Sequence, residues 1–217
     1  MSGPVARAAA GERARSPVWA LVTRMAALEK LIYGSIGRAV LRRPAVPVGA
    51  NGFGYHSQSI TVLVIFIVLS AFEIVIVDLI VHQWLIPRLV LLIVGIWGVV
   101  WMTGLLCAHV MRPHTVGPDG VRVRDGLDLD VHVPWSDVYS VTIGTVTDEP
   151  KSPRLVDDAT TLAVRVSDAT NISIVLEGAT RVVLPGSNPK GGEQQISTVR
   201  LWADDPKAFL AAVGEHI

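Results

Sequence analysis

The chain has 217 residues, of which 50% are hydrophobic and 18% are charged, and its formal net charge is zero. Soluble domains usually carry about 25% charged residues, so the mean hydropathy of +0.46 argues against a purely soluble protein. The single cysteine, Cys107, excludes an internal disulfide, and no Cys/His group has the spacing of a zinc site. We therefore expect a membrane protein without a disulfide framework, a metal site or a cofactor.

The N-terminal region, residues 1–58, combines basic charge with apolar residues at helical spacing. Its eight Lys/Arg residues and two Glu residues give a net charge of +6. Ser16-Pro17 is typical of an N-cap followed by proline at the first helical position, and the pattern predicts an amphipathic helix over residues 17–43. Near an anionic bilayer each basic residue contributes about 1 kcal/mol. The sequence therefore predicts binding to an anionic lipid surface through Arg24, Lys30, Arg38, Arg42 and Arg43.

Two other interpretations fit parts of this region. A secretory signal peptide needs about 7–15 uncharged apolar residues before a small-residue cleavage site, and the charges here keep such stretches short. Residues 111–217 carry ten Lys/Arg and fifteen Asp/Glu, a net of −5, so the basic region could pair with them instead. The same acidic excess argues against nucleic acid as a partner.

Residues 59–110 are the most apolar part of the chain. Two runs, 60–81 and 88–110, are separated by a short turn that begins at His82. Each is long enough to cross about 30 Å of hydrocarbon, which takes about 20 residues. The pattern predicts a transmembrane helical hairpin, and a buried hairpin of a soluble protein is the weaker alternative. Basic residues concentrate before the first run, so the positive-inside rule places both termini in the cytoplasm.

Two acidic residues interrupt the first run. Glu73 lies roughly 13 Å from the turn by helix rise, near the bilayer centre, where an acid costs about 2.5–3.5 kcal/mol to insert. Asp78 lies nearer the turn and shares a helix face with His82. We favour a protonated Glu73 that hydrogen-bonds inside the hairpin, where Trp97 and Trp101 offer indole N–H donors at similar depth. A contact with a partner helix and ion- or proton-linked transport are the alternatives.

Small residues thin one side of the second run, at Gly95, Gly98, Gly104 and Ala108. Gly104 and Ala108 form a small-xxx-small pair, a spacing that lets helix backbones approach closely. Close packing within the hairpin is the favoured interpretation, and oligomerisation is the alternative.

Residues 111–217 alternate apolar and polar residues between turn signals, which is typical of strands. Asp204-Asp205-Pro206 then indicates a capped helix over residues 205–216. The expected fold is a small antiparallel barrel or curled sheet of about seven strands, closed by that helix. Arg122 and Arg124 share one strand face among acidic residues, so we expect a solvated face there. The expected strands are 121–124, 127–133, 138–146, 161–166, 172–176, 180–184 and 196–202.

A family resemblance is carried by two stretches: Val116-Gly117-Pro118-Asp119-Gly120-Val121-Arg122-Val123 and Val131-His132-Val133-Pro134-Trp135-Ser136-Asp137-Val138-Tyr139-Ser140-Val141. With the hairpin before them, residues 112–217 resemble the pleckstrin-homology-like (PH-like) domain of bacterial two-span membrane proteins. The resemblance implies a seven-stranded split barrel with a C-terminal helix, a place in the bacterial inner membrane and no enzymatic activity. It also implies binding of a protein partner or assembly into oligomers. The long basic region before the hairpin departs from this pattern.

No catalytic or cofactor-binding signature accompanies these features. The glycine-containing turns, such as Gly117-Pro118-Asp119-Gly120, lack the strand and helix context of a phosphate-binding loop. The sequence therefore predicts a membrane-anchored scaffold or assembly module, not an enzyme. The alternative is a small oligomeric channel or transporter subunit that uses Glu73.

Overall fold

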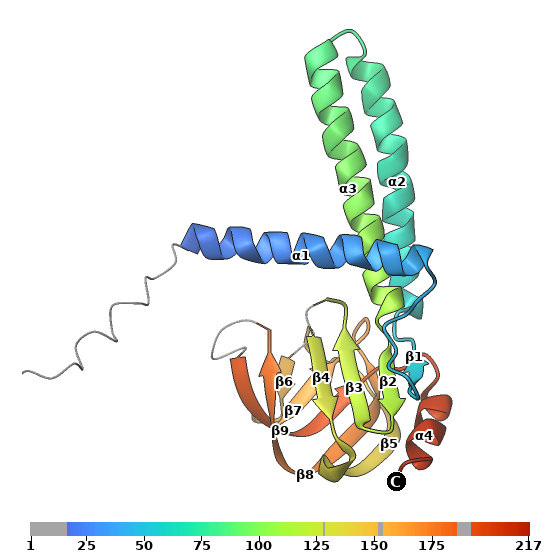
Figure 1. Ribbon diagram of the computed structural model, residues 1–217, viewed down its shortest axis with the longest axis vertical. Helices are drawn as coiled ribbons and strands as arrows, with labels where there is room; N and C mark the ends of the chain where they lie inside the picture. The colour runs from blue at the N-terminus through green and yellow to red at the C-terminus, as the bar shows by residue number, and fades with distance from the viewer. Residues whose placement is uncertain (1–16, 128, 152–153, 186–191) are drawn as a thin grey trace, which may run out of the picture.

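The computed structural model describes residues 17–127, 129–151, 154–185 and 192–217, without the side chains of 17–21, 24, 58 and 59. The predicted N-cap Ser16 lies outside these residues. Figure 1 shows three parts: a helical hairpin, a helix that lies across its base, and a β-domain beneath that helix. The crossing helix is α1, Pro17–Val40, close to the predicted range of 17–43.

The hairpin consists of α2, Ser57–Val81, and α3, Leu85–Met111. The segment Ile60–Val81 has a mean hydropathy of 3.0 and Leu85–Met111 one of 2.4, so both are long and apolar enough to cross a membrane. Trp84 N–H donates to the Val81 carbonyl in the tight turn between them. Pro87 falls in the first turn of α3, where its missing N–H would have no helical partner. The two predicted long apolar helices are therefore confirmed as elements of the fold.

The β-domain contains two sheets and α4, Pro206–Gly214. The first sheet is antiparallel, in the order β1-β2-β3-β4, and the second has the order β5-β8-β9-β7-β6 with β7 and β9 parallel. In Figure 1 the two sheets face one another. The first sheet comprises β1 Asn51–Phe53, β2 His114–Gly117, β3 Gly120–Asp125 and β4 Leu129–Val133. The second comprises β5 Val138–Val146, β6 Arg154–Val156, β7 Thr161–Val164, β8 Thr170–Leu184 and β9 Gly192–Leu201.

The core lies between the sheets and under α4. Alternation explains its composition, because Leu129, Val131 and Val133 of β4 point inward while the residues between them stay exposed. Phe209 of α4 is fully buried, and its ring centroid lies 5.1 Å from that of Phe53 on β1. The predicted cap of α4 is present, since Asp205 accepts a hydrogen bond from Ala208 N–H at 2.9 Å.

The strand pattern differs from the expectation in three ways. The described residues hold nine strands instead of about seven, because the short strands β1, β2 and β6 lack an alternating pattern. The predicted strands 172–176 and 180–184 are one strand, β8, which continues through an irregularity between Val175 and Thr180. The sheet is also not purely antiparallel, since β7 pairs with β9 in parallel.

Candidate functional site

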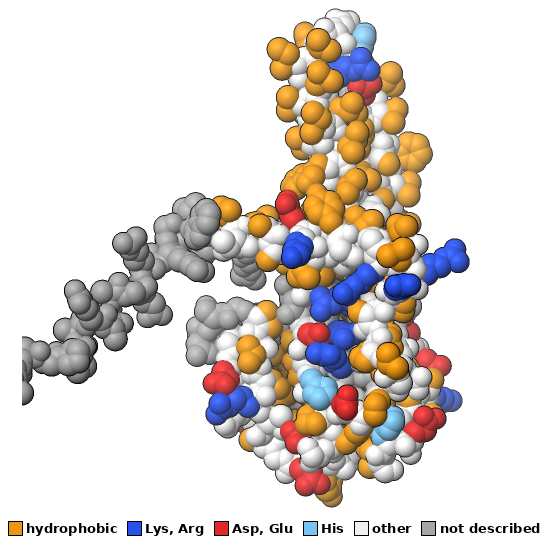
Figure 2. All heavy atoms as spheres, in the orientation of Figure 1, with side chains coloured by type: hydrophobic (Ala, Val, Ile, Leu, Met, Phe, Trp, Pro, Cys, Tyr) orange, Lys and Arg blue, Asp and Glu red, His pale blue; other side chains and the backbone are white. Residues whose placement is uncertain are grey.

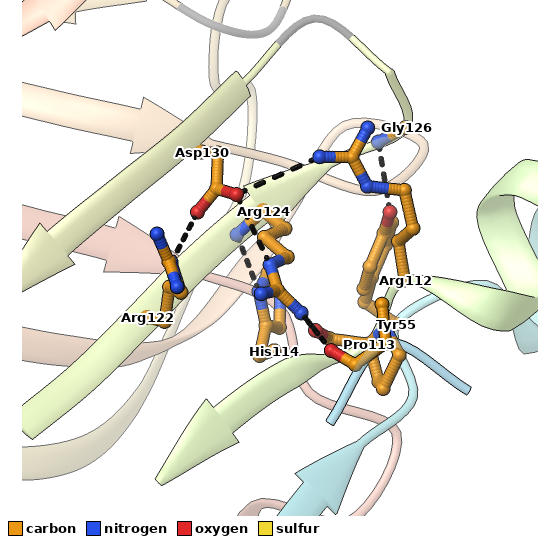
Figure 3. A network of polar contacts seen from close by, with 9 residues as sticks. Tyr55, Arg112, Pro113, His114, Arg122, Arg124, Gly126 and Asp130 are labelled. Carbon is orange, nitrogen blue, oxygen red and sulfur yellow. Dashed lines mark hydrogen bonds and ion pairs between the residues drawn. The ribbon is translucent and has the colours of Figure 1, made fainter. Parts of the chain in front are cut away.

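The first candidate site is the junction where the chain passes between the hairpin and the β-domain. Tyr55 stands between β1 and α2 and is 3% exposed. Its hydroxyl oxygen accepts a hydrogen bond from Gly126 N–H at 2.8 Å (Figure 3), and burial raises the pKa of Tyr55 to about 12. The segment before the hairpin is therefore fastened to the β-domain by pairing of β1 with β2 and by this side chain.

His114, the first residue of β2, lies beside Tyr55 with 4.5 Å between ring centroids. Its Nδ1 accepts from the Arg124 backbone N–H at 3.0 Å, and its Nε2 lies 3.1 Å from the Trp202 carbonyl oxygen. These partners assign a neutral ring with its proton on Nε2. Burial lowers the pKa of His114 to about 4. Both nitrogens are occupied by the fold, so this histidine links β2, β3 and the segment after β9.

Arg124 crosses the junction from β3. Its Nη1 donates to the Ala45 carbonyl at 2.6 Å and to the Pro113 carbonyl at 3.3 Å. Ala45 lies in the segment before the apolar helices, and Pro113 lies in the segment after them. The side chain is 6% exposed, and burial lowers its pKa. The expectation of a solvated strand face is therefore wrong for Arg124, because the segment at Ala45 covers this end of β3.

Asp130 forms ion pairs with three arginines at the junction. Arg122 Nε donates to Asp130 Oδ1 at 2.7 Å, while Arg112 Nη2 and Arg124 Nε each lie 3.5 Å from Oδ2 (Figure 3). Arg122 remains 41% exposed, so the expectation of solvation holds for it. Arg112 directly follows α3, and its pairing therefore connects the end of the hairpin to β4.

Asp204 caps the first helix of the hairpin from the far end of the sequence. Its Oδ2 accepts from the backbone N–H groups of His56 and Ser57, each at 3.2 Å, and its Oδ1 accepts from Ser57 Oγ at 2.6 Å. The N-cap residue of α2, His56, makes no side-chain capping bond of its own. A carboxylate at this place both satisfies free N–H groups and faces the positive end of the helix dipole. The N-terminus of α2 is therefore capped by a residue of the β-domain.

Helix α1 packs on α3 at the predicted small-residue pair. Gly104 and Ala108 are the buried residues of α3, and an added Cβ at Gly104 would collide with Ile32 Cγ2. Ile32 itself is 1% exposed. Gly104 is therefore used for close packing, but against α1 and not within the hairpin as expected.

The second candidate site is a groove between α2 and α3, here called the hairpin groove, with a volume of about 280 Å³. Gly95 lets the helices approach at one point, since an added Cβ there would lie 2.7 Å from Ile74 Cγ1. At Gly98 an added Cβ would meet nothing within 4 Å, so the groove is open there. Its lining consists of Ser70, Glu73, Ile74, Val77, Asp78, Val81, Arg88, Leu91, Leu92, Val94, Gly95, Gly98, Val99 and Met102.

Glu73 lines this groove and is exposed. It makes no hydrogen bond or ion pair with the described residues, and neither Trp97 nor Trp101 lines the groove with it. The reason is helical geometry: Gly95 and Gly98 turn toward α2, and Trp97, two residues after Gly95, is rotated away by about 200°. Trp97 is 49% exposed on the outside of the hairpin. The structure therefore does not bring Glu73 to the indoles that similar depth suggested.

Asp78 pairs across the hairpin with Arg88. Arg88 Nε donates to Oδ1 at 2.6 Å and Nη2 donates to Oδ2 at 2.9 Å, a two-point contact. His82, the expected neighbour of Asp78, instead places Nδ1 2.7 Å from the Leu79 carbonyl oxygen. The pairing has a sequence signal that was missed, because Asp78 and Arg88 lie equally far from Gln83 in the turn.

The predicted lipid-contacting basic residues lie on α1 and just after it. Lys30, Arg38, Arg42 and Arg43 are exposed and form no ion pair with the described residues. Arg24 lies within α1, but its side chain falls outside the described part. Figure 2 shows basic side chains around α1 and on the adjoining edge of the β-domain, below the apolar surface of the hairpin.

In the described part of the chain no three His, Cys, Asp or Glu side chains are grouped so that they could hold a metal ion. Comparison with known proteins found no family model, no curated protein and no solved structure that matches this chain. The arrangement of the junction and the hairpin groove is therefore the basis on which function is argued.

Proposed function

We propose that the protein is a membrane-anchored scaffold or assembly module whose hairpin spans the bacterial inner membrane. Three features support this: two helices of spanning length and hydropathy, eight basic residues before the first of them, and a short turn between them. With the positive-inside rule, both termini and the β-domain lie in the cytoplasm. The PH-like character of the β-domain belongs to the same proposal.

The observation that carries the proposal is the junction. The β-domain is held to the hairpin by β1, by the Tyr55–Gly126 hydrogen bond, by Arg124 on the Ala45 and Pro113 carbonyls, and by Asp204 on the start of α2. Contacts of this kind from both sides of the hairpin hold the domain in one orientation. A domain presented in a fixed pose beside the membrane suits a protein that positions partners.

The direction of α1 supports its predicted place on the lipid surface. It lies across the hairpin base (Figure 1), so a hairpin that crosses the bilayer puts α1 parallel to the membrane plane. Val22, Tyr33 and Val40 are exposed, at 50%, 43% and 77%, and their spacing places them on one stripe. This stripe suits burial in the interface, while Lys30 and Arg38 can reach anionic headgroups.

The test is affinity capture and chemical crosslinking of the tagged full-length protein from membranes. We expect a defined stoichiometric partner, either another protein or more copies of this chain. If the partner is a different protein held by the β-domain, Asp204→Ala and Tyr55→Phe together should loosen the junction and reduce its capture, without removing the protein from the membrane. A protein that remains uncrosslinked and without partners in its own membrane would contradict the proposal.

The hairpin groove supports a second candidate, a small oligomeric channel or transporter subunit. Its carboxyl, Glu73, faces an open groove and has no partner among the described residues. Proton or ion flux into vesicles that contain the purified protein tests this function. A flux that Glu73→Gln abolishes, in a variant that still assembles, would favour the channel over the scaffold.

A further inference from the structure

We infer that the hairpin groove is the contact surface of a parallel dimer of this chain, with the Glu73 carboxyls of two copies hydrogen-bonded to each other. This inference rests on the proposed function and names one partner for it, a second copy. It also assigns a site to that partner, the groove that opens between α2 and α3.

The membrane restricts how two copies can meet. Both enter the bilayer in the same orientation, so a twofold axis that relates them lies along the membrane normal. In such a dimer the same patch is used by both copies, and residues near the axis meet their own counterparts at the same depth. With the hairpin groove placed on this axis, Glu73 of one copy faces Glu73 of the other.

Glu73 suits this arrangement because a protonated carboxyl is self-complementary. It donates one hydrogen bond through its O–H and accepts another through its carbonyl oxygen. An acid exposed to hydrocarbon without a partner is costly, and within the described residues Glu73 has none. A second copy supplies a matching carboxyl at the same depth, whereas an unrelated helix would need a donor there by chance.

The shape of the groove agrees with a helix as its occupant. Its walls are mostly aliphatic, and Gly98 leaves open space where a side chain would stand. Small residues at membrane helix contacts allow close backbone approach, which supplies the packing that drives association in lipid. Gly104, in contrast, is already filled by Ile32 of α1 and is not free for this contact.

The Asp78–Arg88 pair adds charge complementarity at the turn end of the groove. Each copy presents one carboxylate and one guanidinium there, joined at 2.6 and 2.9 Å. About a twofold axis the Arg88 of one copy can approach the Asp78 of the other, so two neutral pairs can form a ring of alternating charge. A chain with only one sign of charge at this place would repel its own copy.

Energy transfer between fluorescently labelled full-length proteins in vesicles tests the inference. We expect transfer that rises with the protein-to-lipid ratio. Gly98→Leu fills the groove and should weaken association by roughly tenfold or more. The matched control is Gly34→Leu on α1, where an added Cβ also meets nothing within 4 Å, and it should leave association unchanged.

Variants at Glu73 separate hydrogen bonding from packing. Glu73→Gln keeps a donor and an acceptor and should dimerise as the native chain does, whereas Glu73→Leu should weaken association by roughly three- to tenfold. Native protein that is monomeric at every ratio would overturn the inference, as would a dimer insensitive to both Gly98→Leu and Glu73→Leu. Neither result would overturn the proposed function, which fails only if capture from membranes also finds no partner.

Discussion

The β-domain and the hairpin are built from the same aliphatic and aromatic residues, but they place them in opposite environments. In the β-domain the large side chains turn inward, and Phe209, Leu129 and Ile174 are fully buried. In the hairpin they turn outward, with Phe72 at 65% and Leu79 at 68% exposure. The first arrangement is stabilised by removal of apolar surface from water. The second gains little of that kind within the chain, so its stability depends on the solvent around it.

The test with the largest expected effect replaces one phenylalanine in each region by alanine. Phe209→Ala removes a fully buried ring and should destabilise the β-domain by about 3–5 kcal/mol. Phe72→Ala removes an equal ring from the outer surface of α2 and should change the unfolding of the β-domain by less than about 0.5 kcal/mol. Urea titration in detergent, followed by hydrogen exchange in β8 and β9, measures both. Equal losses would show that the hairpin and the β-domain unfold as one unit.

The second test changes the pH, which affects the stability of the β-domain through the buried His114. The folded protein holds the pKa of His114 near 4, whereas an unfolded histidine protonates near about 6.5. Stability is therefore full above pH 6.5 and falls as the pH drops toward 4, by up to about 3 kcal/mol from this group.

His114→Gln should flatten that slope, because an amide can accept from Arg124 N–H and donate to the Trp202 carbonyl without titrating. The control is His132→Gln on β4, an exposed site, which should leave the slope intact. Urea midpoints measured between pH 4 and 7 decide the outcome. A slope that survives in the His114→Gln protein would show that other groups cause it.

The third test concerns the packing of α1 on α3. Gly104→Val should push Ile32 away and cost about 1–3 kcal/mol through overpacking. The expected result is faster trypsin cleavage within α1, which carries Lys30 and Arg38. Ile32→Ala in the same chain should restore protection, since it removes the colliding Cγ2. Failure of this rescue would mean that α1 is held by other contacts.

Local signals predicted the parts of the fold that depend on local physics. Runs of 22 apolar residues identify the hairpin, alternation identifies β4 and β5, and Asp205-Pro206 marks the start of α4. The short strands β1 and β2 were not predicted, because neither alternates. Asn51–Phe53 is exposed at its start, and His114–Gly117 is buried throughout. Their pairing places β1 in a sheet with strands that follow the hairpin.

The candidate sites were harder to predict for two reasons. They depend on which face of each helix meets its neighbour, and they join residues that lie far apart in the sequence. Residue counting places Glu73 and Trp97 at similar heights along the hairpin, but it does not say which face of α3 meets α2. Gly95 and Ile74 set that face, and Trp97 is turned outward as a result. Asp204 lies 147 residues from Ser57, and no local pattern connects them. The Asp78–Arg88 pair could have been found by folding the sequence about Gln83.

The smallest expected effect separates two adjacent carboxylates that cap helices in the two regions. Asp205 caps α4 inside the β-domain, while Asp204 caps α2 across the junction. Replacing either by alanine should cost about 1 kcal/mol, or roughly fivefold in local opening. Hydrogen exchange reads each cap at its own amide: Asp204→Ala should speed exchange at Ser57 and spare Ala208, and Asp205→Ala should do the reverse.

The outcome decides how independent the hairpin and the β-domain are. If the two substitutions stay local, the junction is a set of separable ties, and the hairpin can move when Asp204 releases it. If Asp204→Ala also speeds exchange at Gly126, the amide that Tyr55 binds, then the cap and the tyrosine act as one unit. The β-domain would then sense any displacement of α2, because the same carboxylate that starts the helix also accepts from Trp202 Nε1 at 3.3 Å, beside the carbonyl that holds His114.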